Sequence, residues 1–445
     1  MSFFGDQGWF YLSARDMLLT GNFPLVGIAS SHPWLHQGAW WTYVLAFIFS
    51  LTHFNPLAPG YFSAGLGVVT VGLVYFFVSR MFASKVGLLA AFLYATSPLI
   101  IINMRMPYHT VFIPILALLY LFALSKWLGC MMKYFPVLIF SVAMLYNFEI
   151  ATTPFTFILI LCLVFGLWKR KKYATTLANK KIIGYSFLAW LIPMIPMLLY
   201  DVNHGFPQTI KFVLWLGYRF AKLFGFPDIH GDTVFEPLAP FLPFTATKLQ
   251  DFLFLPNQWI AIVLFVAIFL ALTYFVYQDF RKKEISAPLI ALYVTFTIPF
   301  LSYMALQTSS EAYWPMFFPT TMIGFAYVAF RLFNKRKLFI LVNLIVVIIG
   351  CFNTYYLVRD NYLMTPGNYG YPFNQRTSAT QQIITEANGR KYTLIGKGEG
   401  SKFASFTMPY EYLTWWLGHG PSQKKEKLKI FVSETNKGII VTENK

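Results

Sequence analysis

One carboxylate near the start of the chain stands between two glycines, in the segment GDQG at residues 5–8. An amphipathic stretch follows at residues 11–19, and Thr20-Gly21-Asn22 predicts its end. A carboxylate placed in this way can accept the proton of an attacking hydroxyl group that lies within hydrogen-bonding distance. The same residue could instead cap a helix or lie in a solvated loop. Asp6 is therefore a candidate general base, with a structural role as the alternative.

Other motifs that could bind ions or nucleotides are weaker. A divalent cation could be bound by Asp228, His230 and Asp232, but a solvated turn with local hydrogen bonds explains their spacing better. The glycine-rich segment at residues 396–400 follows a predicted strand but lacks the helix that a phosphate-binding loop needs. The three cysteines form no CxxC pair. We expect no nucleotide site, zinc site or disulfide framework.

The composition excludes a soluble fold. Of the 445 residues, 57% are hydrophobic and only 12% are charged, whereas soluble domains carry about 25% charged residues. Uncharged apolar runs recur along the chain, as expected of helices that cross a bilayer. The net charge of +17 then reports on membrane topology rather than on nucleic acid binding. We expect an all-α polytopic membrane protein.

About ten spans are expected in the apolar part of the chain. They cover residues 60–79, 86–103, 109–125, 134–148, 154–168, 182–200, 258–278, 286–305, 312–330 and 338–357. Several contain proline, which is tolerated where neighbouring helices satisfy the freed backbone groups. A further apolar segment at residues 39–53 would break the charge pattern of the loops if it crossed the membrane. We expect an interfacial or re-entrant helix there.

Lys and Arg residues fall in alternate loops, which the positive-inside rule places in the cytoplasm. These loops contain Arg80 and Lys85, Lys126 and Lys133, residues 169–181, residues 281–283, and residues 331–337. Asp6 then lies outside the cytoplasm although residues 1–38 contain no signal peptide. We expect a first span upstream of residue 1 that this sequence lacks; an exported N-terminus without a preceding helix is the alternative.

This topology divides the chain into three parts. Residues 1–59 form a first external loop with interfacial helices, and residues 60–357 form the transmembrane region, with an external loop at residues 201–257. Residues 358–445 form a small extracytoplasmic α/β domain. Within it we expect helices at residues 378–387 and 409–417 and strands at residues 392–395 and 428–432.

The predicted spans contain almost no ionisable residues in their interiors. Glu149 lies at an outer end and Asp279 at an inner end. Pumps and ion-coupled transporters usually keep such residues at mid-membrane depth. Their scarcity argues against a pump and leaves the outer ends of the helices as the place for chemistry.

Several segments occur in an order and spacing that resemble a known family. They are GDQGWFYLSARDMLLTGNFPLVG at residues 5–27, SSHPWLHQGAWWTYVLAFIF at residues 30–49 and residues 55–110, with a weaker match at Tyr313-Trp314-Pro315. Together they resemble the N-terminal half of the bacterial family 39 glycosyltransferases, which are GT-C membrane enzymes related to protein O-mannosyltransferases and the lipid A aminoarabinose transferase. The resemblance implies a GT-C fold, a polyprenyl-phosphate sugar donor, an extracytoplasmic active site and a span before Asp6.

The resemblance carries over to some site residues and not to others. Asp6 matches the family's acid on the first external loop, which implies a general base in an inverting transfer. The mannosyltransferases have Glu next to that Asp, where this chain has Gln7, so a paired-carboxylate mechanism is in doubt. Relatives often show Arg and a downstream Asp where this chain has Arg105 and His109. A metal site that needs this downstream Asp is therefore in doubt, and a divalent metal remains a possible cofactor. His109 could bind a metal, orient a substrate or have a structural role.

The resemblance also makes a lipid phosphate the leaving group, which departs more readily when its charge is neutralised. The candidate cations are Arg105 and the basic residues Lys211, Arg219 and Lys222. The last three fall at offsets of 0, 8 and 11, on roughly one face of a helix. This face could hold the lipid phosphate, or it could bind anionic lipid headgroups without specificity.

His36 and Tyr313 complete the candidate substrate-binding residues. Tyr313 could line a sugar pocket, or it could belong to the belt of aromatic residues at the membrane interface.

The sequence therefore predicts a multi-pass cell-membrane glycosyltransferase that transfers a hexose or pentose from polyprenyl phosphate to an acceptor protein, lipid or glycan. We expect no nucleic acid partner. Two other classes stay open. A lipid-linked saccharide flippase or transporter also has many spans, and a catalytically impaired membrane scaffold would agree with Gln7, with His109 and with the missing first span.

Overall fold

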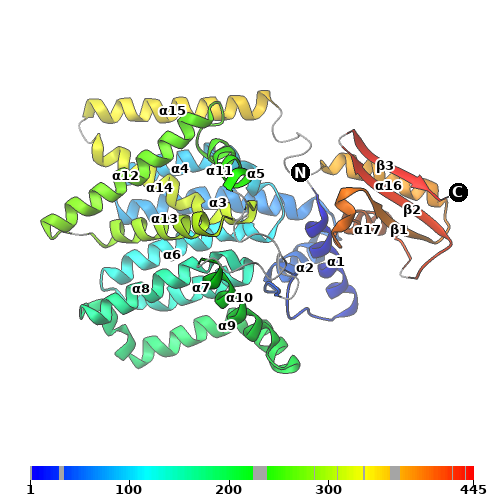
Figure 1. The fold of residues 1–445 in the computed structure, drawn as a ribbon, viewed down its shortest axis with the longest axis horizontal. Coiled ribbons are helices and arrows are strands. Elements are labelled where there is room, and N and C mark those ends of the chain that lie inside the picture. Colours follow the sequence, from blue (N-terminus) through cyan, green and yellow to red (C-terminus); the bar gives the residue numbers. More distant parts are fainter. Residues whose placement is uncertain are drawn as a thin grey trace.

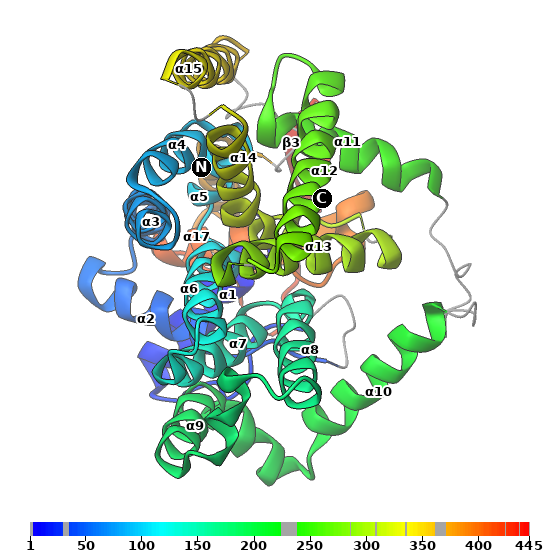
Figure 2. The same cartoon turned by 90° about the vertical axis from the view of Figure 1, so that its left-hand side faces the viewer.

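The computed structural model describes residues 3–29, 35–223, 238–284, 286–307, 309–333, 336–360, 371–422, 424–435 and 437–444. Long apolar helices form a bundle, and a small α/β unit lies at one end of it (Figure 1). The helices of the bundle are α3 (Ala58–Met81), α4 (Ser84–Thr96), α5 (Pro98–Met104), α6 (Ile113–Leu128), α7 (Phe135–Phe148), α8 (Pro154–Trp168), α9 (Lys180–His204), α12 (Gln258–Lys282), α13 (Ala287–Leu306), α14 (Phe318–Leu332) and α15 (Arg336–Arg359). Helix α6 lies at the centre, packed against α3, α7, α13 and α14, whereas α15 lies at the periphery (Figure 2).

The outer helices present large apolar side chains to their surroundings. On α12, for example, Trp259, Val263 and Leu270 are 73%, 65% and 60% exposed. Apolar surfaces of this extent are not stable in water and are expected where helices face lipid. Seven of the described helical segments are long and apolar enough to cross a membrane, and the bent pair α4–α5 would be an eighth. The described part of the chain is thus built as a multi-pass membrane protein.

The expected count of about ten spans is not confirmed. Helices α7 and α14 have 14 and 15 residues, fewer than the roughly 20 that a straight span needs. The expected span at residues 86–103 is broken, because α4 and α5 meet at an angle of 69°. Proline disfavours the helical conformation of the residue before it, and Ser97, which precedes Pro98, has an extended ψ of 121°. The helix therefore ends at Thr96 and starts again at Pro98.

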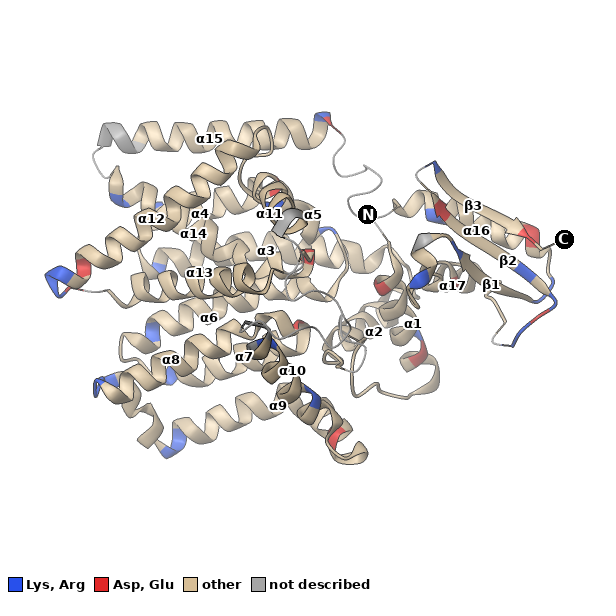
Figure 3. Cartoon of the chain, viewed as in Figure 1, with Lys and Arg blue, Asp and Glu red and all other residues tan. Residues whose placement is uncertain are grey.

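Four helices lie toward the end of the bundle that carries the α/β unit (Figures 1 and 2). They are α1 (Gly5–Thr20), α2 (Trp40–Thr52), α10 (Pro207–Leu223) and α11 (Leu238–Leu253). Turns rich in Lys and Arg gather at the opposite end of the bundle (Figure 3). This separation agrees with the alternation of basic loops in the sequence, and the assignment of the basic end to the cytoplasm stays a prediction.

Short 3-10 helices connect several of the longer elements. They are η1 (His109–Phe112), η2 (Met132–Tyr134), η3 (Ile150–Thr152), η4 (Lys172–Ala178), η5 (Glu311–Phe317) and η6 (Glu399–Lys402). Of these, η1, η3 and η5 matter for the site described below.

The C-terminal unit contains a sheet in the order β1-β2-β3, with β1 parallel to β2 and β2 antiparallel to β3. Its elements are α16 (Phe373–Ala387), β1 (Tyr392–Lys397), α17 (Met408–Trp416), β2 (Leu428–Thr435) and β3 (Gly438–Glu443). Ile383 of α16 packs on Tyr392, Ile430 and Val432 of the sheet. The two predicted helices and the first two strands are confirmed, whereas β3 was not predicted.

Candidate active site

Asp6 lies in the first turn of α1, where a helix favours a negative charge. Both oxygens of its half-buried carboxylate accept hydrogen bonds from hydroxyl groups. The Tyr108 hydroxyl donates to Oδ2 at 3.1 Å, and Ser405 Oγ donates to Oδ1 at 3.0 Å. Tyr108 precedes η1 and Ser405 precedes α17, so three parts of the chain that are distant in sequence meet at this carboxylate.

Tyr108 is a permanent donor to Asp6. Burial raises the pKa of the Tyr108 hydroxyl well above 10.0, and the negative charge of Asp6 raises it further. The phenol therefore stays protonated across the physiological pH range and keeps its hydrogen bond to the carboxylate.

A row of buried polar side chains continues from Tyr108 away from Asp6. The ring centroids of Tyr108 and His109 are 4.0 Å apart, and His109 Nε2 lies 3.2 Å from Oε2 of Glu149. Gln37 Nε2 donates to the same oxygen at 3.2 Å, and the backbone N–H of Ala151 donates to Oε1 at 3.2 Å. Glu149 therefore joins the loop before α2, η1 and η3. The sequence predicts Glu149 at an outer span end but gives no sign of its pairing with His109, because 40 residues separate the two.

The Gln7 side chain makes a hydrogen bond to the backbone of Phe4. It is fully buried, and Oε1 accepts the backbone N–H of Phe4 at 3.0 Å. Gln7 thus caps the start of α1. The doubt about a paired-carboxylate mechanism is consistent with this geometry.

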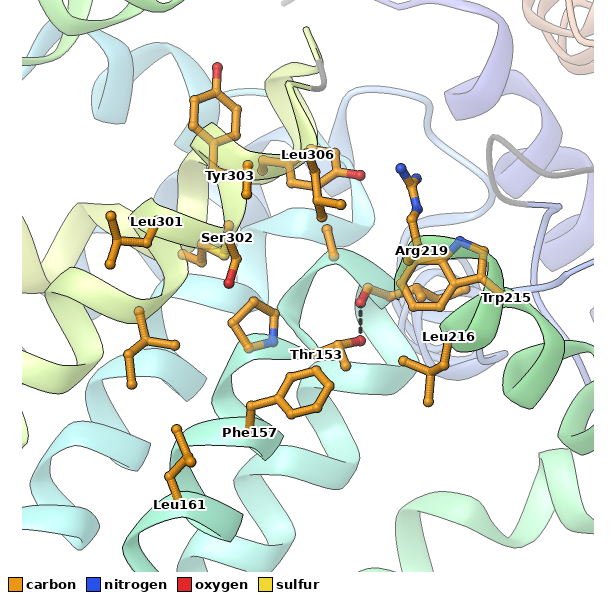
Figure 4. A pocket seen from close by; sticks show the side chains of 17 residues that line it. Thr153, Phe157, Leu161, Trp215, Leu216, Arg219, Leu301, Ser302, Tyr303 and Leu306 are labelled. Atoms are coloured by element: carbon orange, nitrogen blue, oxygen red, sulfur yellow. Dashed lines mark hydrogen bonds between the residues drawn. The ribbon is translucent and has the colours of Figure 1, made fainter. Parts of the chain in front are cut away.

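An apolar cavity of about 430 Å³ lies between α8, α10 and α13. Figure 4 shows Arg219 and Trp215 of α10 on one side, Ser302 and Tyr303 of α13 opposite them, and Phe157 of α8 on a further wall. Tyr313 and Met316 of η5 also line this space. Most of the lining is apolar, so the cavity suits a hydrocarbon chain better than a free sugar.

Arg219 gives the cavity a cation. Its guanidinium lies over the Trp215 ring at 5.4 Å from the centroid. Its Nε is buried and has no hydrogen-bond partner among the residues that the structure describes. A buried donor without a partner is costly, and an anionic ligand at the cavity would satisfy it.

The cavity and the row of polar side chains share a wall. Helix η3 begins directly after Glu149, and its residues Ile150 and Ala151 line the cavity. Ala151 also donates its N–H to Glu149, so the cavity and the row of polar side chains are adjacent.

Two other predicted site residues, Arg105 and His36, neither line the cavity nor make a hydrogen bond to Asp6 within the described part of the chain. Arg105 ends α5 three residues before Tyr108, and its side chain makes no hydrogen bond or ion pair within the described part of the chain. His36 Nδ1 contacts the carbonyl of Gly27, and the His36 backbone N–H donates to Gln208 of α10. The latter bond ties the first loop to α10.

The other predicted cations are on α10. Lys211 is half-buried and does not line the cavity. Lys222 falls in α10, but its side chain lies outside the described residues, as do Asp228, His230 and Asp232. The structure therefore brings Arg219 and Tyr313 together at one cavity and leaves Lys211 apart from it.

An ion cluster between α11 and η5 was not predicted. Lys248 Nζ of α11 lies 2.6 Å from Glu311 of η5 and 3.6 Å from Asp251. Burial raises the pKa of the Glu311 carboxyl, and the charge of Lys248 opposes that rise. Thr245 of α11 also bonds the hydroxyl of Tyr303 at 3.0 Å. These contacts fix α11 against the cavity wall.

Among the described residues no group of three or more His, Cys, Asp or Glu side chains is arranged to hold a metal ion.

This chain is similar to known proteins in its three-dimensional structure. No family model matches the sequence, and no curated protein sequence matches it. The structure of ArnT from Cupriavidus metallidurans bound to undecaprenyl phosphate is similar with a TM-score of 0.61 and 11% identity, over 99% of this chain and 93% of that one.

Two archaeal structures from Archaeoglobus fulgidus are also similar. The oligosaccharyltransferase AglB in complex with an inhibitory peptide and a dolichol-phosphate gives a TM-score of 0.56 at 12% identity, over 93% of this chain and 60% of that one. The oligosaccharyltransferase in complex with Zn and sulfate gives 0.57 at 14% identity, over 94% and 58%. The chain thus spans less than two thirds of the oligosaccharyltransferase. The GT-C fold that the sequence resemblance implied is confirmed: this chain has the fold of the glycosyltransferases ArnT and AglB.

Proposed function

We propose that this chain is an inverting membrane glycosyltransferase that moves a sugar from a polyprenyl-phosphate donor to an acceptor hydroxyl, with Asp6 as the general base. The observation that carries the proposal is the apolar cavity with Arg219 on its wall. An isoprenoid chain needs an apolar groove and its phosphate needs a cation, and the cavity offers both. The structures of ArnT and AglB, which share the fold, hold undecaprenyl phosphate and a dolichol-phosphate.

In the proposed reaction the acceptor oxygen attacks the anomeric carbon of the sugar from the side opposite the phosphate. Asp6 accepts the proton of the acceptor hydroxyl as the new C–O bond forms. The bond from the anomeric carbon to the phosphate oxygen breaks, and the lipid phosphate leaves with the electron pair. Arg219 stabilises the charge that grows on this phosphate, and Arg105 adds positive charge to the external end of the protein. The product has the inverted anomeric configuration.

The remaining roles belong to the same proposal. Tyr108 orients the Asp6 carboxylate, and Tyr313 borders the space for the donor, while His36 and His109 position the first loop and η1. We also propose the cell membrane as the location, with the N-terminal region and the C-terminal unit outside the cytoplasm. The division at residues 1–59, 60–357 and 358–445 stays a prediction.

The stereochemistry of the product tests the mechanism. Membranes that contain the protein would be supplied with radiolabelled undecaprenyl-phosphate hexoses and pentoses. The glycosylated acceptor would be isolated, and NMR would determine the anomeric configuration of its sugar. We expect the anomeric configuration to be opposite to that of the donor. Retention of configuration would contradict the single-displacement mechanism.

A further inference from the structure

The C-terminal unit touches the candidate general base directly. Gly5 and Gly8 bracket Asp6 on α1, and both lie against the segment that leads into α17. A Cβ on Gly5 would lie 2.6 Å from Ser405 Oγ, and one on Gly8 would lie 2.3 Å from the backbone nitrogen of Pro409. No side chain fits at either position, so α1 and this segment are in close backbone contact.

The segment that presents Ser405 is held firmly within the C-terminal unit. Phe406 lies against Gly396 and Gly400, where added Cβ atoms would come within 2.5 and 2.6 Å of its ring. These two glycines belong to the glycine-rich segment at residues 396–400, which lacks the helix that a phosphate-binding loop needs. Their observed role is to enclose the Phe406 ring.

The far side of the segment is held by α17. The Tyr412 hydroxyl donates to the Phe54 carbonyl at 2.8 Å. Its ring lies within a buried group formed with Phe3, Tyr11 and Phe49, at centroid distances of 6.4, 5.1 and 5.6 Å. Ser405 therefore reaches Asp6 from a rigid support.

Ser405 is 8% exposed, and its hydroxyl donates to Asp6 Oδ1, while Tyr108 donates to Oδ2. Two donors on different oxygens fix the plane of a carboxylate. A carboxylate has about four lone-pair sites, so Asp6 can still accept a hydrogen bond from the hydroxyl of an acceptor.

We propose that Ser405 is a positioning residue and that the C-terminal unit completes the active site by fixing the orientation of Asp6. This inference rests on the proposed function, in which Asp6 is the general base. It goes beyond that function because it assigns the C-terminal unit a part in the chemical step.

The test compares Ser405→Ala with Ser401→Ala in the full-length protein. Ser401 is exposed in the same segment, and its hydroxyl donates only to the Gly398 carbonyl among the described residues. For Ser405→Ala we expect kcat for sugar transfer from undecaprenyl phosphate to fall about 10- to 100-fold, the cost of a misplaced catalytic group. The KM for the donor and the thermal unfolding midpoint should stay at their wild-type values, and Ser401→Ala should have wild-type kcat.

Three results would overturn the inference. One is a wild-type kcat in Ser405→Ala, and another is an equal loss of kcat in Ser401→Ala. The third is a sugar attached to the Ser405 peptide in mass spectrometry, because Ser405 would then be an acceptor. If Asp6→Asn abolishes transfer while Ser405→Ala is fully active, the proposed function stands and only this inference fails. If the wild-type protein transfers no sugar, both fail.

Discussion

Arg219→Gln should weaken the binding of undecaprenyl phosphate, because Arg219 is the cation on the wall of the apolar cavity. Its Nε is buried and has no partner among the described residues, so a phosphate would gain a charge-assisted hydrogen bond without breaking an existing one. Such bonds contribute about 1.5–3 kcal/mol. Since Arg219 is only half-buried, solvent screening favours the lower part of this range. At about 1.4 kcal/mol for each tenfold change, Kd should rise about 10- to 30-fold.

The assay is titration of the detergent-solubilised protein with undecaprenyl phosphate, followed by native mass spectrometry. Undecaprenol, which lacks the phosphate, serves as the ligand control and should bind equally well to wild type and variant. Lys211→Gln is the matched protein control, because it removes a positive charge from α10 away from the cavity lining. Its Kd should change less than about threefold.

Two results would refute this reasoning. An unchanged Kd for undecaprenyl phosphate in Arg219→Gln would mean that the cavity does not hold the phosphate beside Arg219. An equal loss of affinity for undecaprenol would mean that the substitution damages the cavity rather than removing a phosphate contact.

Three further predictions concern the architecture of the site. Gly8→Ala places a Cβ 2.3 Å from the backbone at the start of α17 and should lower the free energy of unfolding by about 1–3 kcal/mol, and with it the thermal unfolding midpoint. In the control Gly72→Ala the added Cβ meets open space, so the midpoint should not fall. Equal midpoints in the two variants would contradict the close contact at Gly8. Because burial raises the pKa of Tyr108 well above 10.0, its hydroxyl stays protonated below that pH, so wild type and Tyr108→Phe should share the shape of their pH–rate profiles between about pH 6 and pH 9. An alkaline limb that only the wild type shows in that range would contradict this. Glu149→Ala leaves His109 and two other donors without their acceptor and should destabilise the fold by at least about 1–3 kcal/mol, whereas an unchanged unfolding midpoint would show that these bonds contribute nothing.

The fold was predictable because apolar runs and basic loops are local properties of the sequence. Helices appear at every expected span, and the two predicted strands of the C-terminal unit are present. The break between α4 and α5 was not predicted, although Pro98 is its local signal. Strand β3 was not predicted, although it pairs antiparallel with the predicted strand β2 and places Val441 opposite Val432.

The site was predictable only in part. Asp6, Arg219 and Tyr313 were selected by residue type, and the last two line one cavity. The contact between Asp6 and Ser405 joins residues 399 positions apart, and no spacing rule reaches that far. The cavity itself is lined mostly by apolar and aromatic side chains, which occur throughout a membrane protein. The ion cluster of Lys248 with Glu311 depends on how α11 packs against η5, which the sequence does not reveal.

The most direct test of the account is sugar transfer by Asp6→Asn. Asparagine keeps the shape of the side chain, but its one oxygen can accept from only one of the two hydroxyl groups, which donate to different oxygens of Asp6. Its amide NH2 faces the other hydroxyl group, and asparagine cannot take a proton from the acceptor. Membranes with equal amounts of wild-type and variant protein would be compared for transfer of a radiolabelled sugar from undecaprenyl phosphate. We predict that the rate falls at least about 100-fold while undecaprenyl phosphate still binds. Transfer at the wild-type rate would contradict the role of Asp6 as general base.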